Sequence, residues 1–243
     1  MSSQLQFLLR RTEGLSIDET LQVLALRFPG AVTFSTSFSD EDQAITHLIA
    51  RGRFPISLFT LDTGRLFQAT HEVWQSTIAA LGVTIKAFHP DPQLLEKYSG
   101  DHGPNAFYRS VALRKDCCHI RKVLPLQRAL KGMSVWITGL RAEHSPHRND
   151  IPQLEWDEQN GVIKYHPLLY WTTEQVAAYV QQHRLPVNAL GARGFVSIGC
   201  EPCTRAIRPG EDFRAGRWWW EEQDKKECGL HVTTSAASHH TQH

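Results

Sequence analysis

The sequence predicts an α/β fold, with a mostly parallel sheet flanked by helices, on three observations. Short continuous runs of apolar, often β-branched residues alternate with stretches of helical periodicity, which is typical of strands buried on both faces. This alternation favours parallel strands joined by right-handed crossovers. The chain has 243 residues, of which 41 % are hydrophobic, and this is enough to bury the core of such a sheet.

The expected elements follow in order along the chain. Strands are expected at residues 31–34, 56–61, 83–88, 135–139 and 162–165. Helices are expected at residues 16–28, 41–51, 66–81, 114–130 and 172–183. Ser16 and Glu19 have the spacing of a capping box at the start of the first of these helices. Ligands of parallel sheets bind beyond the carboxyl ends of the strands, so the loops after these strands matter most for function.

The chain shows no internal repeat and no long linker. We therefore expect one α/β domain over residues 1–209 and a C-terminal segment over residues 210–243, whose small, polar end is typical of disorder. A net charge of +1 gives no strong attraction to nucleic acid or to an anionic membrane. The chain has neither a signal-peptide pattern nor an apolar run of about 18 residues, so we expect a cytoplasmic protein with reduced thiols.

Three of the loops that follow predicted strands carry hydroxyls, glycines and arginines. The first runs from Ser35 to Asp42 into a helix, and its hydroxyls and free backbone N–H groups either bind an anion or only cap that helix. The second contains Gly64, which permits a tight turn, and the third ends at Arg141. Because these loops meet at one edge of the sheet, they suit a nucleotide that carries negative charge.

The five cysteines divide into two close pairs and one distant residue, an arrangement that favours metal binding or catalysis over disulfides in a reducing compartment: Cys117 with Cys118, Cys200 with Cys203, and Cys228. A C-x-x-C pair alone fits a redox dithiol, half a zinc site or half an iron–sulfur site. Adjacent cysteines favour a [4Fe–4S] cluster, because a cubane offers each thiolate its own iron. Zinc and buried free thiols are the alternatives.

Basic residues surround both pairs, and cations lower the energy of an anionic cluster. Most of them are expected on a solvated helix face. Lys122 shares a helical face with Cys118, four residues before it, and is the candidate to lie between cluster and substrate. Cys228 lies between a charged run and Gly229, where an exposed thiolate could reach a site and withdraw, although an unremarkable exposed cysteine would look the same.

With these residues in view, the chain resembles the assimilatory adenylyl-sulfate reductases of the APS/PAPS reductase family. The resemblance runs from about residue 34 to residue 231 and is strongest in SIGCEPCTRAIRPGEDFRAGRWWWEEQDKKECGLH. The segments LDTGRLF and TGLR and the pattern around the adjacent cysteines support it. It implies a Rossmann-like, adenine-nucleotide α-hydrolase-like fold with a flexible C-terminal catalytic segment.

The resemblance also implies the roles of individual residues. Cys117, Cys118, Cys200 and Cys203 correspond to ligands of one [4Fe–4S] cluster, and Cys228 to the nucleophile. The residues implied to bind adenosine 5′-phosphosulfate (APS) are Ser35, Thr36, Ser37, Phe38, Ser39, Leu61, Asp62, Thr63, Gly64, Lys122, Arg141, Arg214, Arg217 and His231.

The reaction implied is reduction of APS to sulfite and AMP. The Cys228 thiolate attacks the sulfonate sulfur, AMP leaves, and thioredoxin then releases sulfite from the S-sulfocysteine. The expected partners are thus thioredoxin and APS, with no nucleic acid and no membrane, and a homo-oligomer is compatible with the sequence. The cluster is expected to act through structure and electrostatics.

Three other functions fit parts of the sequence. A reductase of the 3′-phosphorylated nucleotide (PAPS), or one of dual specificity, needs extra cations for the 3′-phosphate, and the loop from Ser35 to Asp42 contains none. An ATP pyrophosphatase needs a glycine-rich S-G-G-x-D-S loop, which this chain lacks at that place. A non-enzymatic zinc or cluster protein leaves Cys228 and the nucleotide loops unexplained.

Overall fold

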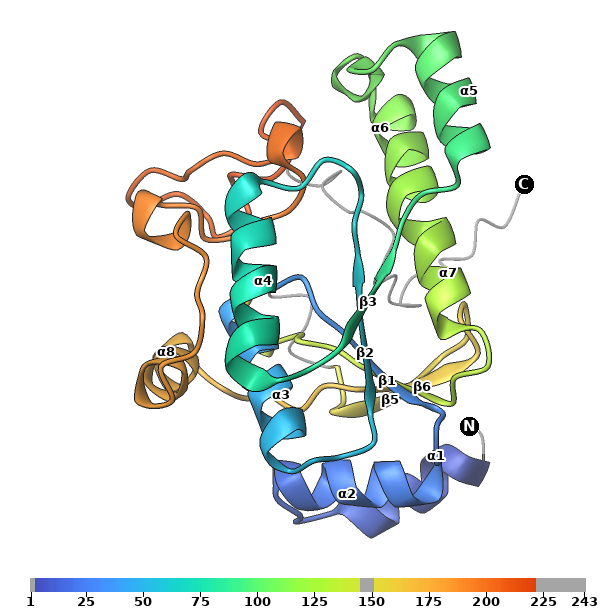
Figure 1. The fold of residues 1–243 in the computed structure, drawn as a ribbon, viewed down its shortest axis with the longest axis vertical. Coiled ribbons are helices and arrows are strands. Elements are labelled where there is room, and N and C mark those ends of the chain that lie inside the picture. Colours follow the sequence, from blue (N-terminus) through green and yellow to red (C-terminus); the bar gives the residue numbers. More distant parts are fainter. Residues whose placement is uncertain (1–2, 145–150, 222–243) are drawn as a thin grey trace, which may run out of the picture.

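The computed structural model describes residues 3–144 and 151–221 of the chain. In this part of the chain one sheet has the strand order β3-β2-β1-β4-β6-β5 (Figure 1). Its strands are β1 Val32–Ser35, β2 Ser57–Leu61, β3 Ile85–Phe88, β4 Val135–Ile137, β5 Leu154–Asp157 and β6 Val162–Tyr165. All neighbouring pairs are parallel except β5 and β6, so the predicted mostly parallel sheet is confirmed.

Strand β5 was not expected from the sequence. It is a short edge strand that pairs antiparallel to β6, with Trp156 opposite Ile163. The two strands are joined by a turn that contains Asn160 and Gly161, and Gly161 has a φ of 66°. An Asn-Gly pair between two short apolar runs is a hairpin signal, and it could have predicted this strand.

The helices cover both faces of the sheet (Figure 1). They are α1 Ser3–Thr12, α2 Ile17–Arg27, α3 Asp40–Arg51, α4 Gln68–Leu81, α5 Pro92–His102, α6 Val111–Cys118, α7 Leu124–Leu130 and α8 Thr173–Gln182. The capping box is present at α2, where the Ser16 amide donates to Glu19 at 2.8 Å and the Glu19 amide to Ser16 Oγ at 3.3 Å. Helices α1 and α5 were not predicted.

The predicted helix over residues 114–130 is divided. Between α6 and α7 lies a π-helical segment, η2 His119–Val123. Pro125 stands in the first turn of α7 and has no N–H to donate to the carbonyl of Arg121, four residues earlier. The α-helical hydrogen-bond pattern is therefore interrupted here, which explains the π-helical segment. Such π segments widen a helix locally and change the direction of the side chains after it.

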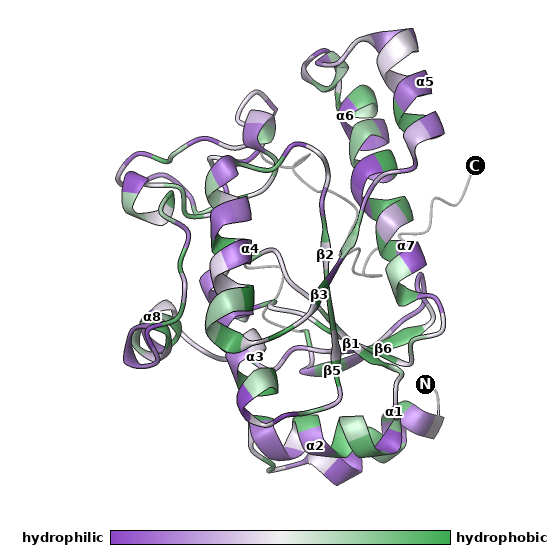
Figure 2. Ribbon diagram, in the orientation of Figure 1, coloured by the Kyte–Doolittle hydropathy of each residue, from purple (hydrophilic) through white to green (hydrophobic). Residues whose placement is uncertain are grey.

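Two apolar layers lie on opposite faces of the sheet. The larger one joins α1, α2, α3 and α4 to the strands and includes Leu24, Phe34 and Ile45. The smaller one packs α7 against Phe59 and Trp136. Figure 2 shows hydrophobic residues along the central strands and hydrophilic residues on the outward parts of α5 and α8. None of the described helices is long and apolar enough to cross a membrane.

Candidate active site

A cavity of about 310 Å³ lies beyond the carboxyl ends of β1, β2 and β4. It is the edge at which the sequence predicted a ligand. Of the predicted substrate residues, those that line this cavity are Ser35, Thr36, Ser37, Phe38, Ser39, Leu61, Thr63, Lys122, Arg214 and Arg217. Asp62, Gly64 and Arg141 are not among its lining residues, and His231 lies outside the described part of the chain.

The loop after β1 is held by its own polar groups. Ser39 caps α3 by accepting from the Asp42 amide at 3.3 Å, so the capping role considered for this loop is real. Asp42 accepts from Ser37 N at 2.6 Å and from Ser37 Oγ at 2.8 Å. Phe38 adopts a φ of 63°, and its ring stacks on Trp74 with centroids 5.6 Å apart. The loop is therefore held in place by contacts of its own residues and of Trp74.

The first turn of α3 is acidic, with Asp40, Glu41 and Asp42 in sequence. Burial raises the pKa of Asp42 to about 6, because its effect exceeds that of the hydrogen bonds from Ser37, which lower the pKa. Negative charge at this helix start works against an anion there. The cations of the cavity come instead from Lys122, Arg214 and Arg217, so the charged end of a ligand is better placed on that wall.

Gly139, at the end of β4, is needed for space. A Cβ at this position would lie 2.3 Å from Asp42 Oδ1 and 3.4 Å from Glu41 Cβ. The loop after β4 can therefore approach the start of α3 only because residue 139 has no side chain. Thr138 and Gly139 both line the cavity. Their loop is one of the three predicted to bind a nucleotide, but these two residues are not among the predicted contacts.

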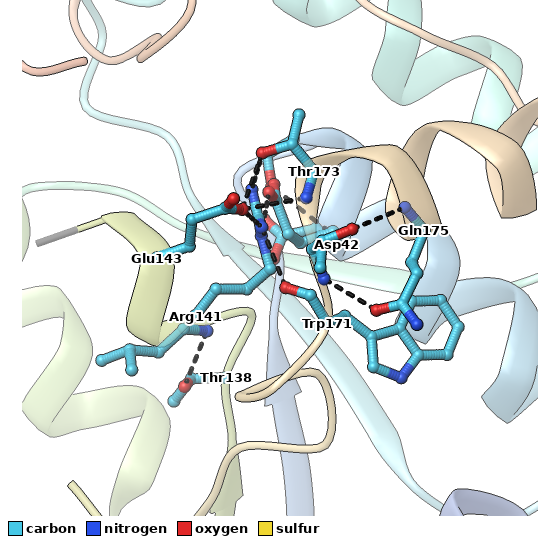
Figure 3. A network of polar contacts seen from close by, with 11 residues as sticks. Asp42, Thr138, Arg141, Glu143, Trp171, Thr173 and Gln175 are labelled. Atoms are coloured by element: carbon cyan, nitrogen blue, oxygen red, sulfur yellow. Dashed lines mark hydrogen bonds and ion pairs between the residues drawn. The ribbon is translucent and has the colours of Figure 1, made fainter. Parts of the chain in front are cut away.

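Arg141 is buried in a polar network (Figure 3). Its Nε donates to Glu41 Oε1 at 2.9 Å, and its Nη1 donates to the Trp171 carbonyl at 3.0 Å. It also pairs with Glu143, which accepts from Thr173 Oγ1 at 2.8 Å. Arg141 thus ties the starts of α3 and α8 to the loop after β4. The structure places it behind the cavity wall rather than among the lining residues.

The four paired cysteines come together, as the sequence predicted. Cys117 and Cys118 end α6, whereas Cys200 directly precedes the single turn η6 Glu201–Cys203 and Cys203 ends it. All four are buried, pack in one cluster with Trp218, and line one small cavity. Cys228 lies outside the described residues.

The loop that carries the second cysteine pair is fixed to the loop after β2. The Glu201 amide donates to the Arg65 carbonyl at 2.8 Å, and Leu66 and Cys200 form an isolated β-bridge. Thr63 Oγ1 lies 3.2 Å from Cys200 Sγ. In the described part of the chain, no three Cys, His, Asp or Glu side chains are arranged to hold a single metal ion.

Of the six basic residues that flank the cysteine pairs, only Lys115 and Arg208 are exposed, which corrects the expectation that most of them lie on a solvated helix face. Arg114 and Arg121 are buried and line the cysteine cavity together with Arg65 and Lys122, whereas Lys115 is exposed. Arg114 forms a two-bond ion pair with Glu221, with Nε–Oε1 3.0 Å and Nη2–Oε2 2.7 Å. The end of α6 packs against Phe107, Trp218 and the second cysteine pair, and this packing encloses basic residues whose sequence pattern suggests a solvated face.

Local charge affects the thiols unequally. Burial raises the pKa of Cys203 to about 12. Burial also acts upward on Cys200, but the Lys122 charge, the Thr63 hydrogen bond and Arg217 outweigh it and lower the pKa of that thiol. Cys200 and Lys122 line both the cysteine cavity and the larger one. The predicted place of Lys122, between the cysteines and the substrate cavity, agrees with this geometry.

Comparison with known proteins decides the family. Residues 31–206 match the family described as the phosphoadenosine phosphosulfate reductase domain. The chain belongs to this family. The match covers β1 through η6 and most of the lining of both cavities. Phe213, Arg214 and Arg217 of the larger cavity and Trp218 of the cysteine cavity lie beyond it. The predicted family is confirmed.

Relatives within this reductase family extend the likeness. An adenosine 5′-phosphosulfate reductase from Burkholderia cepacia is 52 % identical over 84 % of this chain and 81 % of its own length. One from Sinorhizobium fredii is 46 % identical over 94 % of this chain and 90 % of its own length.

Solved structures confirm the adenine-nucleotide α-hydrolase-like fold. A phosphoadenylyl-sulfate reductase from Candida auris superposes with a TM-score of 0.71 at 27 % identity, over 85 % of this chain and 98 % of that one. Yeast FAD synthetase, at 15 % identity and a TM-score of 0.54, shares the fold alone.

Proposed function

We propose that this chain reduces APS to sulfite and AMP in the cytoplasm, with thioredoxin as electron donor, in assimilatory sulfate reduction and cysteine biosynthesis. Two relatives of about 50 % identity, each named adenosine 5′-phosphosulfate reductase, support the proposal. The single observation that carries it is the shared wall of the two cavities. Cys200 and Lys122 line both, so a site for an anionic nucleotide directly adjoins a group of four buried cysteines.

The four cysteines fit a [4Fe–4S] cluster better than a single zinc ion. Their thiols converge on one cavity, and two of them, Cys117 and Cys118, are adjacent in the chain, which suits one tetrahedral ion poorly. A cubane offers each thiolate its own iron, which removes that constraint. Cys117, Cys118, Cys200 and Cys203 would hold it. Bound there, it would supply structural support and negative charge that orders the cations around it.

The first chemical step belongs to Cys228, which lies beyond the described residues. Its thiolate attacks the sulfonate sulfur of APS, and the bond from sulfur to the bridging phosphate oxygen breaks, so AMP leaves with that electron pair. Lys122, Arg214 and Arg217 line the cavity and supply positive charge for the leaving phosphate and the sulfonate oxygens. His231 is a further candidate contact from the sequence.

Release of sulfite needs two electrons from outside the chain. A thioredoxin thiolate attacks the Cys228 sulfur, sulfite leaves, and a mixed disulfide forms. The second thioredoxin thiol then displaces Cys228 as a thiolate, which leaves thioredoxin oxidised. Sulfur thus goes from the sulfate to the sulfite level, and the chain returns to its starting state.

Reduction of PAPS is the second candidate, because the Candida auris structure of similar fold carries that name. The 3′-phosphate of PAPS would require additional positive charge. The loop from Ser35 to Asp42 has no lysine or arginine, and its helix start is acidic. These features favour APS.

The test is anaerobic turnover with thioredoxin on protein whose iron and sulfide have been quantified, comparing APS with PAPS. Sulfite from APS with about four irons per chain is the expected result. Turnover only with PAPS would replace the substrate. Zinc in place of iron, with no sulfite from either nucleotide, would favour the non-enzymatic binding protein.

Two cysteine variants separate the proposed roles. Cys228→Ser should abolish sulfite formation and keep the iron content and the visible absorption of the cluster, since it removes only the nucleophile. Cys200→Ala should lose iron and activity together. Turnover by Cys228→Ser would contradict the nucleophile assignment, and full iron in Cys200→Ala would contradict the ligand set.

A further inference from the structure

Arg217 occupies a place that depends on a neighbouring glycine. A Cβ on Gly199 would lie 2.4 Å from Arg217 Nη2 and 2.6 Å from its Cζ. The φ of Gly199 is outside the left-handed region, so the backbone does not demand glycine here. What residue 199 supplies is space for the guanidinium, directly before Cys200 in the chain.

The ring of Trp218 also packs on this guanidinium. Arg217 Cζ lies 4.9 Å from the Trp218 ring centroid, within the range of a cation–π contact, and Arg114 Cζ lies 4.7 Å from it. Trp218 is 1 % exposed, and its amide donates to the Cys203 carbonyl at 3.2 Å. The ring is therefore fixed to the loop of the second cysteine pair.

The backbone of Trp218 is strained. Its φ of 42° lies in the left-handed region, which a bulky side chain rarely adopts. Strain of this kind persists where surrounding contacts impose it, and it concentrates at functional sites. Here the surroundings include the paired cysteines and three guanidinium groups, those of Arg114, Arg217 and, at 5.9 Å, Arg214. Arg214 and Arg217 line the larger cavity.

We propose that Gly199 and Trp218 are positioning residues, which form a slot that holds the Arg217 guanidinium toward the charged end of the nucleotide. The slot rests on the proposed function, because it assigns to Arg217 the phosphosulfate of APS. Gly199 lines the larger cavity and Trp218 lines the cysteine cavity, and neither supplies charge to the substrate in this assignment. Each acts by restricting a long side chain that would otherwise lose its orientation, and preorganised charge binds an anion more tightly than mobile charge.

The test compares the affinity of Gly199→Ala for APS with its affinity for adenosine, which lacks the charged groups. The variant should bind APS about tenfold more weakly and adenosine as the wild type does, because only the guanidinium is displaced. Gly191→Ala is the matched control, since a Cβ there meets no atom within 4 Å. Equal loss for adenosine and APS would mean general damage and would overturn the slot.

A double-mutant cycle then asks whether Gly199 acts through Arg217. Added to Arg217→Ala, the Gly199→Ala change should cost no further APS affinity, because the displaced group is already absent. Full additivity, or an Arg217→Ala variant that binds APS normally, would contradict the proposal. Wild-type protein that does not bind APS at all would contradict the proposed function instead.

Trp218 gives an independent test if Gly199→Ala loses iron. Trp218→Phe keeps an aromatic face and should retain most of the APS affinity, whereas Trp218→Leu should show the selective loss of APS binding. Iron and sulfide are measured on both. Equal affinities of the two variants, with iron retained, would overturn the role of the ring.

Discussion

Asp42 is the residue at which the local geometry has the clearest energetic cost. Its carboxylate accepts two hydrogen bonds from Ser37 and lies against Gly139, away from water. Burial raises its pKa from 3.8 to about 6, because the charged form is poorly solvated there. A carboxylate that costs stability and lines a cavity is characteristic of a site shaped for binding.

This pKa predicts a pH-dependent effect of Asp42→Asn. The folded state binds the proton more tightly than the unfolded state, so the stability of the wild type falls as pH rises from about 4 to about 6. The variant lacks this loss. Its free energy of unfolding relative to wild type should rise across that window, by roughly 3 kcal/mol at most.

Denaturant titrations of both proteins at several pH values measure the difference. Asp101→Asn is the control, because the Asp101 carboxylate is exposed and its hydrogen bond with Lys97 lowers its pKa. That control should show no such rise. Parallel stability curves for Asp42→Asn and the wild type would mean that the burial of this carboxylate has no energetic cost.

At the residue scale, the sequence indicates the place of residues whose chemistry is local, but it does not indicate contacts that a residue makes with a distant partner. The meeting of two cysteine pairs and the place of Lys122 follow from spacing and residue type. Arg141 carries the same chemistry as a substrate ligand, but it pairs with Glu41, 100 residues away. No local pattern encodes that pairing.

At the scale of elements, the ion pair between Arg114 and Glu221 joins α6 to the end of the described chain. The two side chains are 0 % and 3 % exposed. Arg114 also packs on the Trp218 ring, so the segment that follows the second cysteine pair is attached to the helix that ends in the first pair. An uncompensated charge would be left buried if either partner were removed.

Glu221→Gln should therefore lower the free energy of unfolding by about 3 kcal/mol. The substitution keeps the shape and removes the charge that Arg114 faces. Glu211→Gln is the matched control, because its pair with Arg205 is partly exposed, and its loss should be much smaller. Urea titration measures both. A Glu221→Gln variant as stable as the control would show that the buried pair contributes nothing net.

The elements themselves were largely predictable, because alternating apolar runs and capping residues are local signals. The exceptions have physical causes. The π segment depends on how Pro125 interrupts the ladder, and it divides a helix that periodicity alone reads as continuous. Helix α5 starts with Asp91 as its cap and Pro92 in its first turn, but it buries only Tyr98, so its apolar pattern is weak.

At the scale of the whole molecule, the net charge is only +1, yet several cations converge on one cavity. They come from η2 and from residues 214–217, which are brought together by the fold. Attraction of an anion is thus local, and the molecule has no strong global field that would steer it from a distance.

This distribution predicts the salt dependence of binding. Raising the ionic strength from about 0.1 M to about 1 M shortens the Debye length from roughly 10 Å to roughly 3 Å. The affinity for APS should fall about tenfold, and that for adenosine should change less than about twofold. Isothermal titration with both ligands measures this, and an APS affinity that does not change with salt would contradict a cationic site.

The shared wall of the two cavities has a consequence for the order in which the protein is made. All six strands of the described sheet are complete at Tyr165, whereas Gly199, Cys200 and Arg217 follow later. Ribosomes add about 5–20 residues per second, and structure forms from the amino end first. A nascent chain can thus assemble its sheet while Cys117 and Cys118 still lack Cys200 and Cys203, and the nucleotide cavity can close only after Arg217 has been added.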